Sequence, residues 1–228
     1  MTRVEQTVKE NVAKANDDYE REPRWPVLVA FLAIGGLYAA LPPSLAVIPY
    51  WQLLAVIALL LIPAIIARFY DQHHINQMLG YLVNGVITLA MVSSLVLLVQ
   101  ALPTQQETPT ELLRSAASLW ITNILVFALW YWRLDAGGPN HRDLRPGHPD
   151  GAFLFPQMMS DEAKAATNTP MWSPNFVDYL FLAFNTSTAL SPTDVPVLSR
   201  WAKLLMMVQA LISLTVIVLL AARAVNIL

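Results

Sequence analysis

The sequence predicts an all-α fold, a polytopic transmembrane helical bundle, on three observations. Of its 228 residues, 56% are hydrophobic and 13% are charged, whereas ordinary soluble domains carry about 25% charged residues. The mean hydropathy of the chain is +0.48. Most charges lie in residues 1–24 and 134–174, and long uncharged runs separate these two blocks. Uncharged runs of helical length are typical of chains that cross a lipid bilayer.

Five of the apolar runs are predicted to be full transmembrane helices, because each approaches or exceeds the ~20 residues that cross ~30 Å of hydrocarbon. Tryptophan and tyrosine gather near the ends of these runs, as amphipathic rings do at the headgroup level. The predicted spans cover about residues 26–41, 51–67, 75–102, 112–134 and 198–228.

A sixth apolar segment, residues 175–190, is only 16 residues long and carries Asp178 and four consecutive polar residues from Asn185 to Thr188. It is either a re-entrant half-length helix, or a sixth span whose polar end is buried against protein. A re-entrant helix places the carboxy terminus on the side opposite the amino terminus. A sixth span places both termini on the same side.

The charge blocks divide the chain into four parts. In the first part, valines four residues apart among charges predict an amphipathic tail outside the membrane. In the third part, glycine, proline and charge predict an extramembrane loop with little regular structure. The parts are the tail at 1–24, a four-helix transmembrane region at 25–134, the loop at 135–174, and a half-helix, polar turn and final span at 175–228.

The positive-inside rule predicts a multipass protein of the cell's inner (plasma) membrane with a cytoplasmic amino terminus. Lysine and arginine are concentrated in the tail, the second connection and the long loop, whereas the first connection has none. The residues counted on the cytoplasmic side are Arg3, Lys9, Lys14, Arg21, Arg24, Arg68, Arg142, Arg145 and Lys164.

Composition also excludes several classes of function. The chain has no cysteine, which rules out disulfides, thiolate metal sites and cysteine nucleophiles. A net charge of −2 without a basic stripe predicts no nucleic-acid partner. The expected partners are therefore the lipid bilayer and other membrane subunits or further copies of the chain. No pattern predicts a catalytic site, so we expect no enzyme activity and no cofactor.

Two sets of polar residues are candidates for metal binding or for helix contacts. The loop residues His141, Asp143, His148 and Asp150 form two His-x-Asp pairs, but a solvated loop is the favoured interpretation and no metal is predicted. Within the spans, polar side chains that lipid leaves unsatisfied should face other helices or a wet cavity. These are Asn84, Asn123, Gln209 and Ser213.

The polar turn after the half-length helix contains the candidate site. Ser191, Pro192 and Asp194 match an N-cap, a proline at N1 and an acid at N3, which predicts a helix–turn–helix whose hydroxyls cap backbone groups. The alternative is a pore or solute path along this turn. The candidate residues are Asn185, Thr186, Ser187, Thr188, Ser191, Thr193 and Asp194.

Several short motifs in the carboxy-terminal part of the chain suggest a family. They are Phe153–Met158, Phe176–Tyr179, Ser191–Asp194, Arg200–Lys203 and Ala221–Leu228. With these motifs, about residues 130–228 resemble an uncharacterised bacterial family of multipass membrane proteins. That resemblance implies a membrane-embedded helical fold and brings no known activity.

A second, more distant resemblance is to the pore loop and inner helix of potassium-channel-like proteins. It rests on an apolar half-helix, a Thr/Ser-rich turn ending in Asp194, and a long following helix. Residues 186–194 contain no glycine, which predicts against a potassium-selective carbonyl filter. The leading functional prediction is a non-catalytic membrane subunit or scaffold, and the alternative is a channel-like or small-solute transport protein that uses residues 185–194.

Overall fold

The computed structural model describes residues 22–70, 72–101, 108–143, 151–160, 172–191 and 194–225. This part of the chain is helical, with one isolated bridge and no sheet, so the predicted all-α class is confirmed. Four helices are long and apolar enough to cross a membrane, and α2 is a shorter apolar helix. The main helices are α2 (Trp25–Ala39), α3 (Tyr50–Phe69), α4 (His73–Ala101), α5 (Pro109–Leu134), α8 (Phe176–Thr188) and α9 (Arg200–Val225).

Each of these helices begins and ends within three residues of a predicted apolar segment. Capping boxes set two of the starts. Thr108 Oγ1 accepts a hydrogen bond from the Glu111 amide at 3.3 Å, and the Glu111 carboxylate accepts from the Thr108 amide at 3.0 Å. In the same way, the Asp178 carboxylate accepts from the Asn175 amide at 2.8 Å at the start of α8. These bonds satisfy backbone donors that a helix start leaves free.

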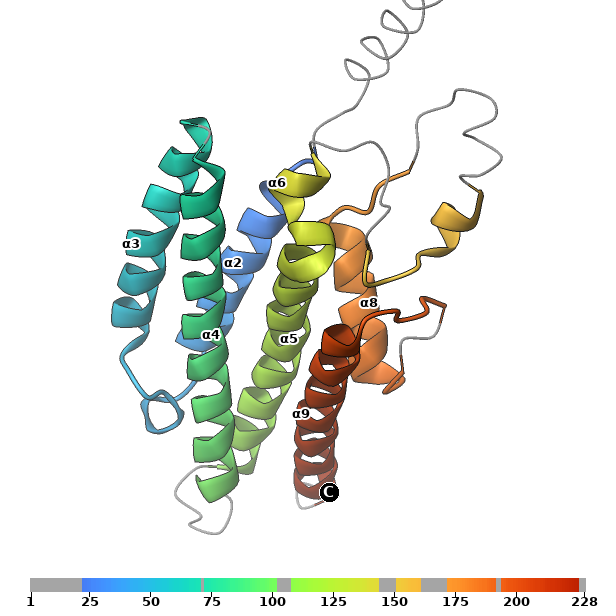
Figure 1. The fold of residues 1–228 in the computed structure, drawn as a ribbon. Helices are drawn as coiled ribbons and strands as arrows, with labels where there is room; N and C mark the ends of the chain where they lie inside the picture. The colour runs from blue at the N-terminus through green and yellow to red at the C-terminus, as the bar shows by residue number, and fades with distance from the viewer. Residues whose placement is uncertain are drawn as a thin grey trace, which may run out of the picture.

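The helix α5 is the centre of the bundle (Figure 1). It contacts α2, α4, α8 and α9, and α3 packs on the outer side of α4. In its apolar window 67% of the residues are buried, against 22% in α3 and in α9. A helix that is surrounded by other helices has no lipid-facing stripe, whereas α3 and α9 keep broad apolar faces for the membrane.

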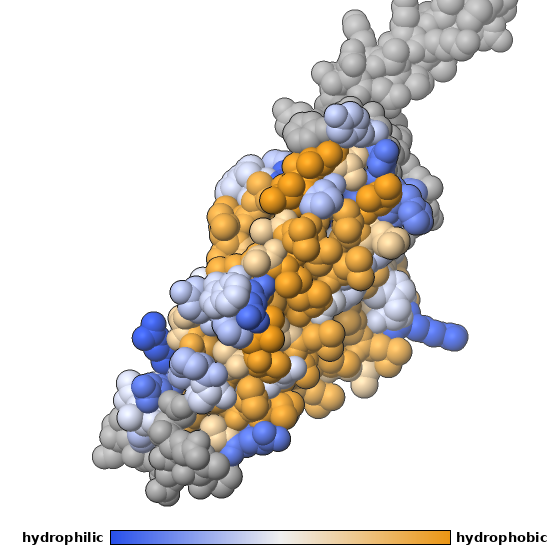
Figure 2. Space-filling view, turned by 90° about the vertical axis from the view of Figure 1, so that its left-hand side faces the viewer, coloured by the Kyte–Doolittle hydropathy of each residue, from blue (hydrophilic) through white to orange (hydrophobic). Residues whose placement is uncertain are grey.

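The flank formed by α3 shows this membrane-facing character (Figure 2). A broad apolar surface faces the viewer, and hydrophilic residues gather mainly toward its margins. Large exposed side chains on α3 include Leu59 at 71% and Ile62 at 57% exposure. In water such a continuous patch is a liability, but in a bilayer it is the expected exterior.

One end of the bundle, here called the polar end, is where α2, α4 and α8 begin and α3 and α5 end (Figure 1, top). It also carries η2 (Asp135–Gly137) and α6 (Pro139–Arg142), while η1 (Pro43–Leu45) joins α2 to α3 at the opposite end. Hydrogen bonds tie the polar end together. Asn140 Nδ2 donates to Asn76 at 3.2 Å, and Gln77 Nε2 donates to the Gly137 carbonyl at 3.2 Å.

Part of the loop expected at residues 135–174 packs into the bundle. Phe153 is fully buried and Phe155 is 3% exposed. The Phe153 ring lies against Tyr131 of α5, Tyr179 of α8 and Trp201 of α9. The short η3 (Pro156–Ser160) follows. This segment therefore joins the three helices that form the candidate site.

Candidate functional site

The half-length helix α8 ends halfway along the bundle. Ser187 in its last turn accepts a hydrogen bond from Asn123 Nδ2 at 3.5 Å. Asn123 lies 11 residues before the end of α5 at Leu134, which is roughly 16 Å along a helix that is roughly 39 Å long. Because α8 begins at the polar end and has 13 residues, its length of roughly 20 Å agrees with this depth.

After α8 the chain turns back toward the polar end. Leu190 adopts a left-handed conformation with φ of 54° directly after the C-cap residue Ala189. Further along, the Leu154 amide donates to the Pro196 carbonyl at 2.9 Å, and the Leu198 amide donates to the Ala152 carbonyl at 2.8 Å. These two bonds hold the returning segment beside the buried Phe153, and α9 begins immediately after it.

A network of polar side chains fixes α8 between α5 and α9. Gln209 of α9 is its centre and is fully buried. Its Nε2 donates to the Ala183 carbonyl and to Ser187 Oγ, both at 2.8 Å, and its Oε1 accepts from the Tyr131 hydroxyl. All the hydrogen-bonding atoms of the Gln209 amide are thereby used.

Ser213, one turn further along α9, extends the same network. Its Oγ donates to the Ser187 carbonyl at 2.7 Å and accepts from Trp120 Nε1 at 3.0 Å. Asn123 Nδ2 also donates to the Gln209 carbonyl at 3.3 Å. The prediction that Asn84, Asn123, Gln209 and Ser213 face other helices or a cavity agrees with their burial, and the last three bond to neighbouring helices.

The polar-turn residues do not converge on one point. Thr186 is buried and its hydroxyl donates back to the Leu182 carbonyl at 2.8 Å, while the exposed Thr188 donates to the Phe184 carbonyl at 2.9 Å. Ser187 faces the network described above. The Asn185 carbonyl accepts from the Ala189 amide, Ser191 is half-buried, and Asp194 is exposed. Pro192 and Thr193 lie outside the described residues.

No helix begins at the predicted N-cap Ser191 within the described part of the turn. Asp194 and Val195 lie in a non-helical stretch, and the next helix begins only at Arg200. Because residues 192 and 193, which would form the first turn of that helix, lie outside the described residues, the capping function of Ser191 and Asp194 stays a prediction. At the start of α8, Asn175 and Asp178 do form a capping box, with the same three-residue separation of cap and acid as Ser191 and Asp194.

A groove of about 380 Å³ lies beside the polar turn, between the end of α8 and the first half of α9. Ser191, Leu190 and the exposed Lys203 contribute to its walls. The remaining lining is largely apolar, from Val197, Met206, Met207 and Ala210, together with Thr186. The groove is thus an apolar depression with one cationic side chain at its edge.

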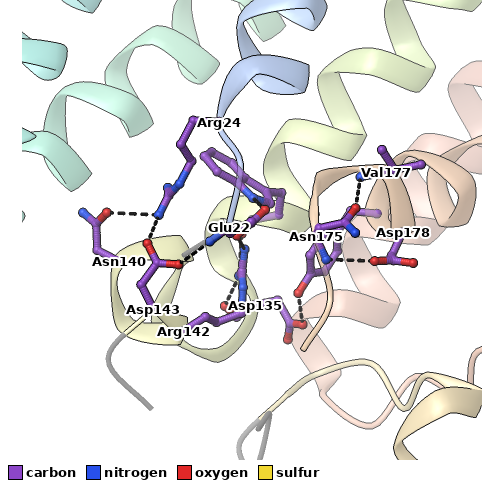
Figure 3. A network of polar contacts seen from close by, with 11 residues as sticks. Glu22, Arg24, Asp135, Asn140, Arg142, Asp143, Asn175, Val177 and Asp178 are labelled. Atoms are coloured by element: carbon purple, nitrogen blue, oxygen red, sulfur yellow. Dashed lines mark hydrogen bonds and ion pairs between the residues drawn. The ribbon is translucent and has the colours of Figure 1, made fainter. Parts of the chain in front are cut away.

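A second cluster of polar side chains lies at the polar end (Figure 3). Arg142 Nη2 pairs with the Glu22 carboxylate at 3.1 Å, and Arg24 pairs with Asp143 at 2.5 Å. The Asp135 carboxylate is fully buried and accepts from the Tyr179 hydroxyl at 2.7 Å. Burial lowers the pKa of Arg142, but the nearby Tyr179, Glu22 and Asp135 together raise it above its ordinary value. Arg142 therefore stays charged and acts as a structural cation.

The His-x-Asp pairs do not form a metal site in the described residues. Asp143 is engaged by Arg24 and by the Glu22 amide. His141 lines a separate cavity of about 430 Å³ together with Ser199 and Trp201, and the described walls of this cavity contain no carboxylate. Within the described ranges no group of three His, Cys, Asp or Glu side chains lies close enough to hold a metal. His148 and Asp150 fall outside those ranges.

Several network residues were not singled out from the sequence. Tyr131 and Trp120 looked like interfacial aromatics, and Asp135 and Arg142 belonged to a loop that was expected to be solvated. The chemistry of these two clusters is that of hydrogen bonds and ion pairs which hold elements in place. Comparison of the chain with family models, with curated proteins and with solved structures finds no match.

Proposed function

We propose that the chain is a five-span protein of the inner membrane, with α8 as a re-entrant half-helix and the amino terminus in the cytoplasm. Its function in this proposal is that of a non-catalytic membrane subunit, which binds a neighbouring membrane chain through the flank formed by α8, the polar turn and α9. The family resemblance of residues 130–228 fits such a protein and remains a prediction.

The observation that carries this proposal is the exposure of irregular backbone at half depth. Thr188, Ala189 and Leu190 are exposed where α8 ends, level with the middle of α5. Hydrocarbon does not tolerate lipid-exposed irregular backbone, because free carbonyl and amide groups find no partner there. Protein or water must cover this segment, and the apolar lining of the 380 Å³ groove favours protein.

A channel-like or transport function is the second candidate, and the order of elements favours it. A half-helix, a returning segment and a long helix follow one another as in a pore loop. Two features weigh against cation flow. The hydroxyls of Thr186 and Thr188 bond to carbonyls of their own helix, and Lys203 places a positive charge at the groove.

Site-directed cross-linking in native membranes tests the subunit proposal. Because the chain has no cysteine, Leu190→Cys introduces a single thiol beside the groove, and Leu59→Cys introduces one on the lipid-facing flank of α3. With a short reagent that carries a maleimide at one end and a photoreactive diazirine at the other, we expect Leu190→Cys to give a discrete product of higher mass and Leu59→Cys to give none. Equal cross-linking of the two variants, or none for either, would count against the proposal.

Flux measurements separate the channel-like alternative. Wild type and Asp194→Asn are reconstituted in liposomes, and cation flux is compared with that of empty liposomes. We expect no flux above the empty control for either protein. Flux in wild type that falls in Asp194→Asn, with unchanged thermal stability of the variant, would support a pore at the polar turn instead.

A further inference from the structure

Arg133, in the last turn of α5, is a buried cation without a counter-charge. Its side chain is 7% exposed. Among the described residues its guanidinium makes no ion pair and no hydrogen bond, and its Nε is fully enclosed. The carboxylates of the polar end are engaged elsewhere, since Glu22 pairs with Arg142 and Asp143 pairs with Arg24. A buried charge of this kind is costly unless something pairs with it.

Gly80 of α4 leaves the space that the Arg133 guanidinium occupies. A Cβ atom at Gly80 would lie 1.8 Å from Arg133 Nη1 and 2.0 Å from its Cζ. The guanidinium therefore lies directly on the α4 backbone, and only a glycine leaves room for it there. Glycine inside a helix costs about 0.5–1 kcal/mol relative to alanine. Gly80 is therefore a destabilising residue for the helix, and it lies where Arg133 contacts α4.

A second guanidinium lies close by. The Cζ atoms of Arg24 and Arg133 are each 5.3 Å from the centroid of the Trp132 ring. Stacking on an indole face leaves the edge of a guanidinium, with its N–H donors, free to bind an oxyanion. Arg24 already has Asp143 as its counter-charge, so Arg133 is the guanidinium beside this ring that an anion would neutralise.

The position of Arg133 along the bundle axis indicates which anion lies close to it. Arg133 is one residue from the end of α5, at the polar end, where a transmembrane helix meets the phosphate layer of a bilayer. Arginine binds phosphate oxygens through parallel N–H bonds more specifically than lysine does. We propose that Arg133 binds a phosphate group at the polar end of the bundle, between α4 and α5, supplied by a membrane phospholipid or by free phosphate.

Binding measurements with three probes test this site on the purified full-length chain in detergent. The probes are dioleoylphosphatidylglycerol, dioleoylglycerol with the same acyl chains and no phosphate, and inorganic phosphate against chloride at equal ionic strength. Native mass spectrometry counts bound lipid, and the shift of the thermal-unfolding midpoint reports phosphate. We expect phosphatidylglycerol to bind more tightly than dioleoylglycerol. A response to inorganic phosphate as well assigns the affinity to the phosphate alone, and its absence assigns it to the lipid.

Two variants and a matched control locate the site. Arg133→Gln should weaken phosphatidylglycerol binding about tenfold, as expected for one lost charge-assisted contact. Arg114→Gln, which removes an exposed arginine near the other end of the same helix, should leave binding unchanged. Gly80→Ala keeps every charge but displaces the guanidinium, so it should weaken binding too, and it replaces Arg133→Gln if that variant fails to fold.

Two results would overturn the site. The first is equal binding of phosphatidylglycerol and dioleoylglycerol by wild type. The second is phosphatidylglycerol binding that neither Arg133→Gln nor Gly80→Ala changes relative to Arg114→Gln. Either result would leave Arg133 as a cation that extends its donors to interfacial water alone.

Discussion

The hydrogen bonding of buried polar side chains differs between the two sides of the bundle. On the side of α5, α8 and α9, the amide of Gln209 uses all its hydrogen-bonding atoms, and Ser187 and Ser213 have partners on neighbouring helices. On the side of α2, α3 and α4, Asn84 is 1% exposed, and neither atom of its amide has a partner among the described residues. Apolar surface dominates the rest of that side.

This difference follows from what each side must hold. The helices α3 and α4 are long enough to cross a membrane; α4 packs against α5, and α3 packs against α4. The helix α8 has 13 residues and ends within the bundle. It is therefore too short to reach from one membrane surface to the other. Hydrogen bonds from Gln209, Asn123 and Ser213 fix its depth instead. Polar side chains therefore stabilise α8, a helix that is too short for bilayer thickness to position it.

The largest effect is expected where the two sides are joined, at the buried ion pair of Glu22 and Arg142. Glu22→Leu leaves the Arg142 guanidinium, which is 2% exposed, without its carboxylate. Removing one partner of a buried pair costs about 3 kcal/mol or more. The free energy of unfolding, measured by denaturant titration in mixed micelles, should fall by that amount.

The Arg24–Asp143 pair supplies the control for this variant, because its side chains are 15% and 14% exposed. Asp143→Leu should cost about 1 kcal/mol, within the range of solvent-accessible pairs. Equal losses for Glu22→Leu and Asp143→Leu would show that burial does not distinguish the two pairs.

The second effect concerns the centre of the α8 network. Gln209→Leu removes three side-chain hydrogen bonds, to Tyr131, Ala183 and Ser187. At about 0.6 kcal/mol for each bond in a membrane protein, unfolding should become easier by about 2 kcal/mol. The control is Gln52→Leu, at an exposed position on α3, which should change the free energy of unfolding little. A loss no larger than that of the control would mean that the network does not hold α8.

A third pair of variants compares the two sides directly. Asn123→Leu breaks bonds to Ser187 and to the Gln209 carbonyl and should destabilise the protein by about 0.6–1 kcal/mol. Asn84→Leu removes an unpartnered amide and should leave stability unchanged or raise it by up to about 1 kcal/mol. The same titration measures both. Destabilisation by Asn84→Leu equal to that by Asn123→Leu would remove the contrast between the sides.

The smallest effect is expected at the turn after α8. Leu190 has φ of 54°, a conformation that costs a non-glycine residue about 1–2 kcal/mol. Leu190→Gly should therefore stabilise the protein by about 0.5 kcal/mol once the greater freedom of glycine in the unfolded chain is counted. Ala189→Gly, at φ of −91°, should destabilise it slightly. If Leu190→Gly lowered the free energy of unfolding more than Ala189→Gly does, the contacts of the Leu190 side chain would outweigh its backbone strain.

The sequence predicts the helices well, because apolar runs and flanking prolines are local signals. It also predicts that Asn123 and Gln209 are buried, since lipid leaves an amide unsatisfied. It does not predict which groups they meet. The burial of Arg142 and Asp135 was missed because glycine, proline and charge around them are typical of exposed loops. Their partners, Glu22 and Tyr179, lie 120 and 44 residues away in the chain, and no local pattern connects residues so far apart.

A re-entrant α8 puts the end of α9 on the side opposite the polar end. Single cysteines at His141, exposed at the polar end, and at Ala222, exposed near the end of α9, distinguish the two sides. Intact cells are treated with an impermeant maleimide, before and after permeabilisation. We predict labelling of Ala222→Cys in intact cells and of His141→Cys only after permeabilisation. Identical labelling behaviour of the two positions would place them on the same side and contradict the re-entrant helix.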